Sequence, residues 1–152
     1  NTFPKLRELI PLYRRAYTRA GHENAGEALS LLAPVFVGES NNSVRHTTEP
    51  SINRFIQSLI DTFPRAPSND SPKGKLLAEA AERLRNTTYD DVCNTMAIYE
   101  TPELCVEKLG RLQEEFNMNR FICWFNTGGL IPHAQVMKSM ELFAERVIPH
   151  FS

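Results

Sequence analysis

The stretch 120–152, RFICWFNTGGLIPHAQVMKSMELFAERVIPHFS, decides the fold of this chain. It begins with a compact apolar run, residues 121–125, which is too short for a helix and rich in aromatic side chains, so it predicts a buried strand. A turn over residues 126–129 follows, and Pro132 lies where the first turn of a helix accepts a proline. We therefore expect a strand, a Gly-Gly loop and an amphipathic helix, which together make one βα unit.

The expected helix carries apolar residues at helical spacing. The stripe consists of Val136, Met140, Phe143 and Val147, widened by Met137, Ala144 and Ile148. Because both methionines lie on this stripe, Met137 and Met140 are interpreted as core residues. Pro149 is expected to end the helix.

Length and composition are those of one globular domain spanning residues 1–152. The hydrophobic content is 41% and the charged content 23%, so the chain can bury a sizeable core. The net charge is −1, and no run of Lys or Arg predicts a nucleic-acid surface. No apolar stretch approaches the ~20 residues that span a bilayer. Neither a nucleic acid nor a membrane is therefore expected as a partner.

The cysteines and histidines point away from disulfide and metal chemistry. Cys93, Cys105 and Cys123 are an odd number without CxxC spacing and are interpreted as thiols of a reducing compartment. The N-terminus shows no signal-peptide pattern, so a cytoplasmic location is expected. The four histidines lack the spacing of a metal site, and no metal is predicted.

The chain before this stretch opens with a predicted helix and then a strand. The helix carries Leu6, Leu9, Ile10, Tyr13 and Tyr17 on one face. Pro11 lies inside this run and is expected to kink or divide the helix. The first strand is expected within residues 29–37. Its regular part is placed at residues 35–37, because Pro34 is unsuited to an uninterrupted central strand.

Two helices and a loop are expected in the middle of the chain. Thr48 is expected to cap a helix that carries Pro50 near its first turn. The stretch 64–74 is rich in Pro, Ser, Asn, Asp and Gly and predicts a flexible surface loop. A short helix over residues 75–85 should then turn Leu76 inward.

A second strand and a third capped helix follow. Thr88 and Asp91 have the spacing of a capping box for one more helical turn. The second strand is expected at residues 95–99. Thr101 is expected to cap the helix after it, with Pro102 at the first helical position.

A helix followed by three strand–helix units predicts parallel strands joined by helical crossovers. The strands are expected near residues 32–38, 95–100 and 120–126. The first and third of them are expected to leave unpaired edges.

Several short segments in a fixed order carry a family resemblance. They are residues 12–14, 20–22, 35–40, 97–103, 121–125, Gly128, Gly129 and 139–149. In this order and spacing they resemble the C-terminal part of bacterial luciferase-like flavin-dependent monooxygenases, over most of the chain. The resemblance implies an α/β fold that is part of a (β/α)8 TIM barrel. A whole barrel takes ~250 residues, so about three parallel βα units correspond to its C-terminal half.

The resemblance also implies a function. Such proteins are oxidoreductases in which reduced FMN, or the deazaflavin F420 in related branches, works with molecular oxygen or by hydride chemistry on a small-molecule substrate. Because three strands cannot close a barrel, Val35, Val37, Ile98 and the run 121–125 are expected to be exposed. They should pair with a missing N-terminal half or by self-association into an oligomer. The alternative is a non-catalytic chain that binds a partner through the exposed barrel edges.

Active sites of such barrels lie at the carboxyl ends of the strands. This rule selects residues 38–40 after the first strand and 99–101 after the second. After the third strand it selects Trp124, Asn126, Thr127, Gly128 and Gly129 as cofactor-binding candidates. A Gly pair before a helix permits close backbone approach to a ligand, and the helix N-terminus favours an anionic group. Alternatively, the two glycines only make a sharp turn and Trp124 belongs to the core.

No residue is assigned as catalytic. His133 lies in the first helical turn after the Gly-Gly loop, where it reaches a ligand or is simply exposed. Asp90, Asp91 and Glu100 are the acid and base candidates, but Asp91 already has a capping role. Ser40 lacks the GxSxG context of a hydrolase nucleophile.

Overall fold

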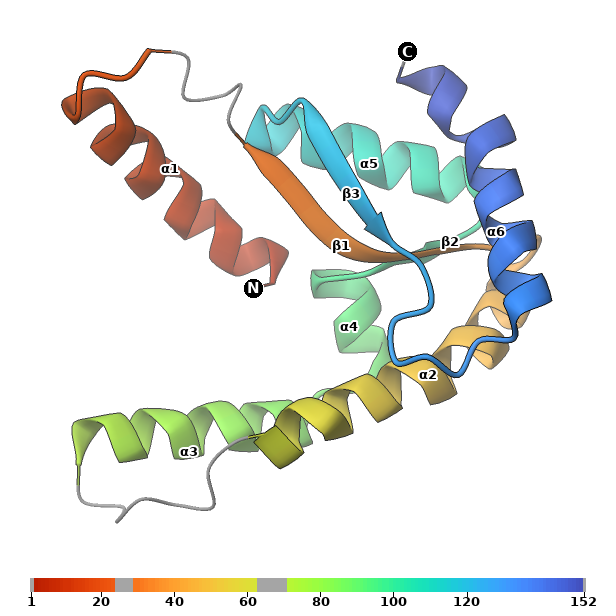
Figure 1. The fold of residues 1–152 in the computed structure, drawn as a ribbon, viewed down its shortest axis with the longest axis horizontal. Helices are drawn as coiled ribbons and strands as arrows, with labels where there is room; N and C mark the ends of the chain where they lie inside the picture. The colour runs from red at the N-terminus through yellow and green to blue at the C-terminus, as the bar shows by residue number, and fades with distance from the viewer. Residues whose placement is uncertain (1, 24–28, 63–70, 152) are drawn as a thin grey trace.

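The computed structural model describes residues 2–23, 29–62 and 71–151. Each strand is preceded and followed along the chain by at least one helix, as Figure 1 shows. The elements are α1 (Phe3–Arg19), β1 (Ser30–Val37), α2 (Asn41–Thr62), α3 (Pro72–Arg85), α4 (Tyr89–Thr95), β2 (Ile98–Glu100), α5 (Pro102–Phe116), β3 (Arg120–Trp124), α6 (His133–Arg146) and the 3-10 turn η1 (Ile148–His150). Of the expected loop 64–74, residues 64–70 lie outside the described residues, and residues 72–74 begin α3.

The three strands form one parallel sheet in the order β2-β1-β3, which confirms the expected parallel pairing. The expected edges were partly wrong, because β1 is the central strand and β2 and β3 are the edges. Residues 30–34 of β1 pair with β3, and residues 35–37 pair with β2. Because β2 has only three residues, it pairs only with the carboxyl end of β1. The longer pairing of β1 is with β3.

Pro34 lies inside β1, so the expectation that the regular strand begins at Val35 was wrong. Pro34 is the last β1 residue paired with β3, opposite Trp124, and pairing with β2 begins one residue later. The missing N–H of proline therefore falls where the strand changes partners. A proline is tolerated at such a junction better than within a continuous ladder.

The helices α1 and α2 also differ from expectation. Helix α1 is a single helix with Pro11 inside it, so of the two expected outcomes, a kink or a division, the division did not occur. Helix α2 begins at Asn41, where the Ser40 hydroxyl accepts a hydrogen bond from the Ser43 backbone N–H at 3.3 Å. Thr48 is therefore not a cap but lies fully buried within the helix, and Pro50 is also internal.

The capping predictions had mixed outcomes. Thr88 and Asp91 form the expected capping box, with the Asp91 backbone N–H 3.1 Å from the Thr88 hydroxyl. The helix α4 that they start runs to Thr95, so β2 begins later than expected, at Ile98. Thr101 occupies the N-cap position of α5 with extended backbone, but its side chain makes no capping hydrogen bond.

Two helices present a different face to the core from the one expected. The Ser139 hydroxyl accepts a hydrogen bond from the Val37 backbone N–H at 2.7 Å, which fixes the face that α6 turns to the sheet. Met137 and Met140 consequently lie away from the sheet, 42% and 43% exposed, and are not core residues. In α3, Leu76 is 61% exposed, and Ala81 is buried instead.

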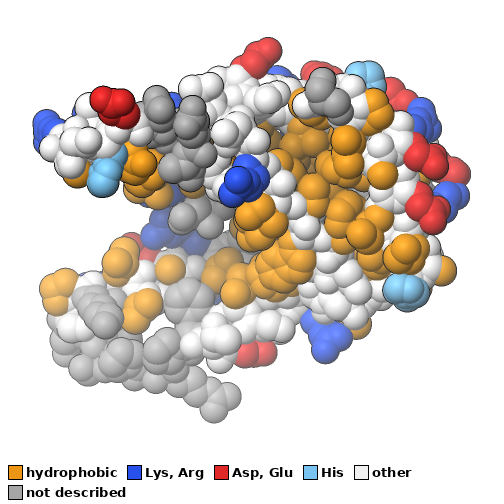
Figure 2. Space-filling model, turned by 45° about the horizontal axis from the view of Figure 1, so that its top comes forward, with side chains coloured by type: hydrophobic (Ala, Val, Ile, Leu, Met, Phe, Trp, Pro, Cys, Tyr) orange, Lys and Arg blue, Asp and Glu red, His pale blue; other side chains and the backbone are white. Residues whose placement is uncertain are grey.

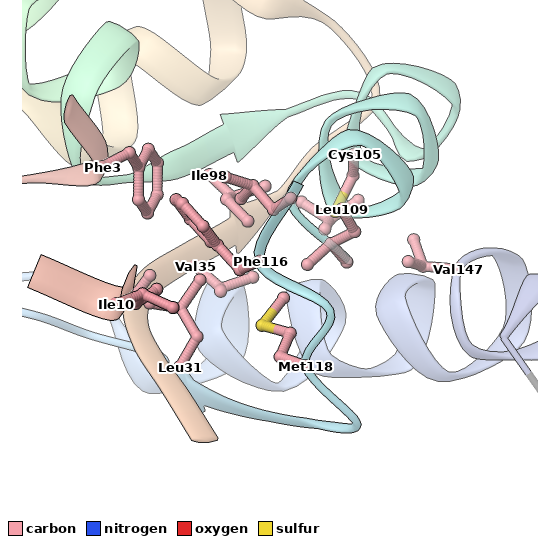
Figure 3. Close-up of a cluster of buried hydrophobic side chains, with 13 residues drawn as sticks. Phe3, Ile10, Leu31, Val35, Ile98, Cys105, Leu109, Phe116, Met118 and Val147 are labelled. Carbon is pink, nitrogen blue, oxygen red and sulfur yellow. The ribbon is translucent and has the colours of Figure 1, made fainter. Parts of the chain in front are cut away.

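Two hydrophobic clusters cover opposite faces of the sheet. Successive side chains of a strand point to opposite faces, so Val35 and Val37 join one cluster and Phe36 joins the other. The first cluster receives side chains from α1 and α5 together with Val147, as Figure 3 shows. The second receives side chains from α2 and α4. Because helices cover both faces here, Val35, Val37 and Ile98 are at most 1% exposed, and their expected exposure was wrong.

One part of the sheet stays uncovered. Leu32 is 56% exposed, and its partner Ile122 is 45% exposed. Both lie on the same face of the sheet as Phe36, which is nearer the carboxyl end of β1. Helix α2 reaches only as far as Trp124, where the Phe55 ring meets the indole edge to face at 5.1 Å between centroids. Among the helices that the structure describes, none has the length and apolarity to cross a membrane.

Candidate functional site

The carboxyl ends of the three strands gather the candidate residues at one edge of the sheet. The Gly38 N–H donates to the Glu100 carbonyl oxygen at 3.2 Å, so the loops after β1 and β2 adjoin. Thr127, from the loop after β3, lies close enough to Tyr99 of β2 for its side chain to affect the pKa of Tyr99. Burial raises the pKa of Tyr99 well above its ordinary value, and the Thr127 side chain opposes that rise only in part. The structure therefore brings all three candidate loops together.

Helix α2 holds the Gly-Gly loop through one serine. The fully buried Ser51 hydroxyl donates to the Thr127 carbonyl oxygen at 2.7 Å and accepts from the Leu130 backbone N–H at 3.0 Å. Gly128 has φ +90°, and a Cβ on it would lie 1.8 Å from the Ser51 carbonyl oxygen. The absent side chain of Gly128 thus permits close approach to α2. Gly129, with φ +75°, has nothing within 4 Å of such a Cβ.

Asn126 and Thr127 fix the shape of the loop from inside. Asn126 has φ +56°, a left-handed conformation that asparagine tolerates better than most residues. Its side-chain oxygen accepts the Ile131 N–H at 3.0 Å, and its carbonyl oxygen accepts the Gly129 N–H at 3.0 Å. The buried Thr127 hydroxyl donates to the Trp124 carbonyl oxygen at 3.2 Å. The side-chain oxygens and the carbonyl oxygens of these two residues are therefore engaged within the protein.

Trp124 differs from the other candidates because its ring is accessible. Its side chain is at the end of β3 and 39% exposed, so it is not a core residue. The Phe55 ring supports it on one side. Among the five candidates, Trp124 and Gly129 are consequently the exposed residues that a ligand can reach.

A small hollow of about 190 Å³ lies beside the loop after β1. Gly38, Glu39, Ser43 and Thr47 line it from that loop and α2, and Gln135, Lys138 and Ser139 line it from α6. The Lys138 ammonium donates to the Glu39 carboxylate at 2.7 Å, which lowers the pKa of Glu39. The sequence predicted the residues of the strand ends but missed Lys138 and Ser139. In the sequence, Ser139 was recognisable only as a serine within a predicted helix. The structure shows that this position is buried.

The aromatic residues Tyr89 of α4 and Tyr99 of β2 form a contact network that includes Thr48 of α2. The Tyr89 hydroxyl and the Thr48 hydroxyl are 2.8 Å apart, and the rings of Tyr89 and Tyr99 stack at 6.3 Å between centroids. Burial raises the pKa of both tyrosines and of Cys93. The raised pKa values disfavour the phenolate and thiolate forms that act as nucleophiles.

The acid and base candidates are engaged in separate places. Asp91 belongs to the capping box, and Asp90 forms an ion pair with Arg45 at 3.0 Å. The half-buried Glu100 pairs with Lys108 at 3.3 Å. His133 begins α6 and is exposed. Within residues 2–23, 29–62 and 71–151, no three His, Cys, Asp or Glu side chains are grouped as metal ligands would be.

Comparisons with known proteins identify the fold. No model of a known protein family matches the chain, and no curated protein sequence matches it. Solved structures do match. The monooxygenase RslO1 from Streptomyces bottropensis superposes with a TM-score of 0.67 at 18% identity, over 100% of this chain and 40% of that one.

A second match is the oxygenating constituent of 3,6-diketocamphane monooxygenase from the CAM plasmid of Pseudomonas putida. This type II Baeyer–Villiger monooxygenase, solved in complex with FMN, gives a TM-score of 0.66 at 16% identity. The match covers 97% of this chain and 40% of the monooxygenase chain. The present chain therefore spans about two-fifths of the length of these solved structures.

Both comparisons confirm the fold that the sequence resemblance implied. The chain is an α/β unit of parallel strands and helices with the fold of part of a monooxygenase, and one of its structural neighbours binds FMN.

Proposed function

We propose that this chain forms part of an oxidoreductase, a monooxygenase that uses reduced FMN and molecular oxygen on a small-molecule substrate. The observation that carries the proposal is the fold match over 97% of the chain to a monooxygenase in complex with FMN. That complex also favours FMN over F420. The proposal treats residues 1–152 as one domain, the C-terminal half of a luciferase-like barrel.

In this proposal, the loop after β3 supplies part of the flavin site. The residues present fit a planar ring with a phosphate. The exposed indole of Trp124 offers a flat surface, and the space beside Gly129 is open. The N-terminus of α6, which follows the loop, favours an anionic group such as a phosphate. When bound, reduced FMN would supply the electrons with which one oxygen atom is transferred to a substrate.

The other candidates have supporting roles. Thr127 and Gly128 dock the loop on α2, and Asn126 closes its turn, so these three hold Trp124 and Gly129 in place. A loop held by buried hydrogen bonds loses less entropy when a ligand binds, and rigidity of this kind raises affinity.

Further proposals concern the surroundings of the chain. Additional strands, from a missing N-terminal half or from another copy, would complete the barrel. The free thiols Cys93, Cys105 and Cys123 support a cytoplasmic location. Trp124, at the carboxyl end of β3, would then belong to a site that this half and the remaining strands of the barrel form together.

The test is an FMN titration of two proteins, followed by flavin fluorescence. One is the 152-residue chain alone, and the other joins this chain to the N-terminal part of a monooxygenase barrel. We expect the joined protein to bind FMN, and the chain alone to bind weakly or not at all because its site is incomplete. Trp124→Leu should weaken binding by the joined protein, whereas Leu104→Ala, at an equally exposed α5 position of 39%, should not. Absence of FMN binding by the joined protein would contradict the proposal.

A second candidate function is a non-catalytic chain that binds a partner through its exposed barrel edge. The observation that favours it is the uncovered pair Leu32 and Ile122, of which Ile122 lies in the edge strand β3. The joined protein discriminates the two functions, because only a flavin enzyme would oxidise a substrate when given reduced FMN and oxygen.

A further inference from the structure

The hollow of about 190 Å³ lies at the carboxyl end of β1, between α2 and α6. Strand β1 is the central strand, and its last residues are held on both sides. The Gly38 N–H donates to the Glu100 carbonyl oxygen of β2, and the Val37 N–H donates to the Ser139 hydroxyl of α6. Helix α6 thus occupies the side of Val37 on which a further strand would pair.

The hollow is separate from the apolar surface beside β3. Figure 2 shows a broad area of hydrophobic side chains on one face of the molecule. In the proposed barrel, further strands would cover apolar surface next to β3. Among the described residues, the hollow shares none of its lining with the apolar groove there. Hydroxyl, amide and charged side chains line the hollow together with Phe36 and Leu142, so its chemistry follows from residues of this chain.

Two hydroxyl groups distinguish the hollow from the rest of the described helices. In those helices, each other serine and threonine donates its hydroxyl proton to a backbone carbonyl oxygen, which is a common local arrangement. These residues are Thr18, Ser43, Thr48, Ser51, Ser58, Thr62 and Thr95. Thr47 of α2 and Ser139 of α6 are the two that do not, and both line the hollow.

Ser139 is the more informative of the two residues because it is only 1% exposed. Its oxygen accepts the Val37 N–H at 2.7 Å, but no described residue accepts its own proton in a hydrogen bond. A buried hydroxyl whose proton has no acceptor costs free energy, so such groups usually meet an acceptor from a ligand or from water. Thr47 is half-buried, and no described group is bonded to its hydroxyl either.

The hollow also has a cation with protons to spare. The Lys138 ammonium has three protons and donates to the Glu39 carboxylate at 2.7 Å. Both side chains are exposed, by 60% and 67%, and an exposed ion pair contributes little free energy. Lys138 can therefore bind a second anionic group. The described lining thus has unused donors on Thr47, Lys138 and Ser139, whereas its carboxylate, Glu39, is already paired.

We propose that this hollow binds a small carboxylate with a compact apolar body. The carboxylate oxygens accept protons from Thr47, Lys138 and Ser139, and the apolar body packs against Phe36 and Leu142. The ligand is small because sites for drug-sized molecules take ~300–1,000 Å³, more than this hollow offers. The site goes beyond the proposed monooxygenase function and does not depend on flavin binding.

The first test is an NMR titration of the ¹⁵N-labelled chain with isovalerate at constant ionic strength. The Val37 amide is the reporter, because it is bonded to the Ser139 hydroxyl that the ligand engages. We expect a saturable shift of this amide, and no shift of the Leu130 amide, which is bonded to Ser51. Isovaleramide, the uncharged analogue, should bind ~10-fold more weakly, because hydrogen bonds to a charged acceptor are stronger. Absence of saturation, or equal binding of acid and amide, would overturn the proposal.

The second test uses variants that remove a donor without breaking a buried bond. Thr47→Val keeps the shape of the side chain, and Lys138→Gln removes the charge; each should weaken isovalerate binding by ~10-fold with little change in melting temperature. Lys5→Gln is the matched control, because Lys5 is also exposed and also pairs with a glutamate, but lies on α1 outside the described lining. Its affinity should equal that of the wild type. Full affinity in Thr47→Val or Lys138→Gln, or an equal loss in Lys5→Gln, would contradict the site.

Discussion

The two ends of β1 have the same backbone conformation but different surroundings. At the carboxyl end, residues 35–37 pair with β2 and are at most 6% exposed, because helices cover both faces. At the amino end, residues 30–34 pair with β3, and Leu32 is 56% exposed. One strand thus has a complete core at one end and an uncovered face at the other. The complete end supports the candidate ligand loops, and the uncovered end leaves apolar side chains exposed.

The contrast between the two ends of β1 predicts its largest difference in stability loss for alanine substitutions at two isoleucines. Ile98 pairs with Val35 at the complete end and is fully buried, so Ile98→Ala should destabilise the fold by ~4 kcal/mol. Ile122 pairs with Leu32 at the uncovered end, and Ile122→Ala should cost less than ~1 kcal/mol in the isolated protomer. Urea unfolding at a concentration where the chain is monomeric measures both. Equal losses would mean that the two ends are equally well packed.

The two loop glycines provide the next contrast. Gly128→Ala would place a Cβ 1.8 Å from the Ser51 carbonyl oxygen in a left-handed conformation, and the combined clash and strain should cost ~3 kcal/mol. Gly129→Ala meets open space and only the conformational cost of ~1 kcal/mol. Thermal or urea unfolding of the matched pair decides whether the close approach to α2 constrains this loop. Similar losses for the two variants would show that φ alone matters.

Ser51 should matter more for the loop than any other serine of α2. Ser51→Ala leaves the Thr127 carbonyl and the Leu130 N–H without their partner, which should cost ~2 kcal/mol. Hydrogen exchange of the Leu130 amide should accelerate, while that of the Val37 amide, bonded to Ser139, should not change. Ser58→Ala is the control, because that exposed hydroxyl bonds only within its helix and its loss should be near zero. Unchanged exchange at Leu130 would argue against the docking role.

The two helix caps differ more in structure than in sequence. The Thr88 hydroxyl accepts the Asp91 N–H, so Thr88→Ala should destabilise by ~1 kcal/mol. Thr101 makes no such bond, and Thr101→Ala should therefore cost less than ~0.5 kcal/mol. The sequence alone predicts ~1 kcal/mol for Thr101 as well. Denaturant midpoints of the two variants test the distinction, and a larger loss at Thr101 would reverse it.

Local patterns predicted much of this molecule. The order of strand–helix units, the capping box at Thr88 and the placement of Trp124 and the Gly-Gly loop after β3 follow from residues near one another in sequence. The resemblance of short segments in order implied the fold that the comparisons confirm.

Features that depend on distant partners were not predictable in the same way. Pro34 is acceptable in β1 because pairing shifts there from β3 to β2, and no local pattern contains that information. Met137 and Met140 fit a helical stripe, but the bond from Val37 to Ser139 selects another face of α6. Ser51 lies in an apolar helix face, and its partners are more than 70 residues away in the chain.

The smallest expected effect concerns Asp91 and pH. Hydrogen bonds from the Thr88 side chain and backbone lower the pKa of Asp91 below its ordinary value of 3.8. A carboxyl group with a lowered folded pKa contributes stability above its unfolded pKa, and that contribution disappears as pH falls through the folded pKa. The wild-type chain should therefore lose this contribution below about pH 4. Asp91→Asn should lose less stability over the same range, since its amide does not titrate.

Asp90→Asn is the matched control, because Asp90 lies next in sequence but pairs with Arg45 and not with the cap. Denaturant unfolding between about pH 6 and pH 3 compares the three proteins. Parallel curves for wild type and Asp91→Asn would mean that the capping carboxylate does not couple folding to pH.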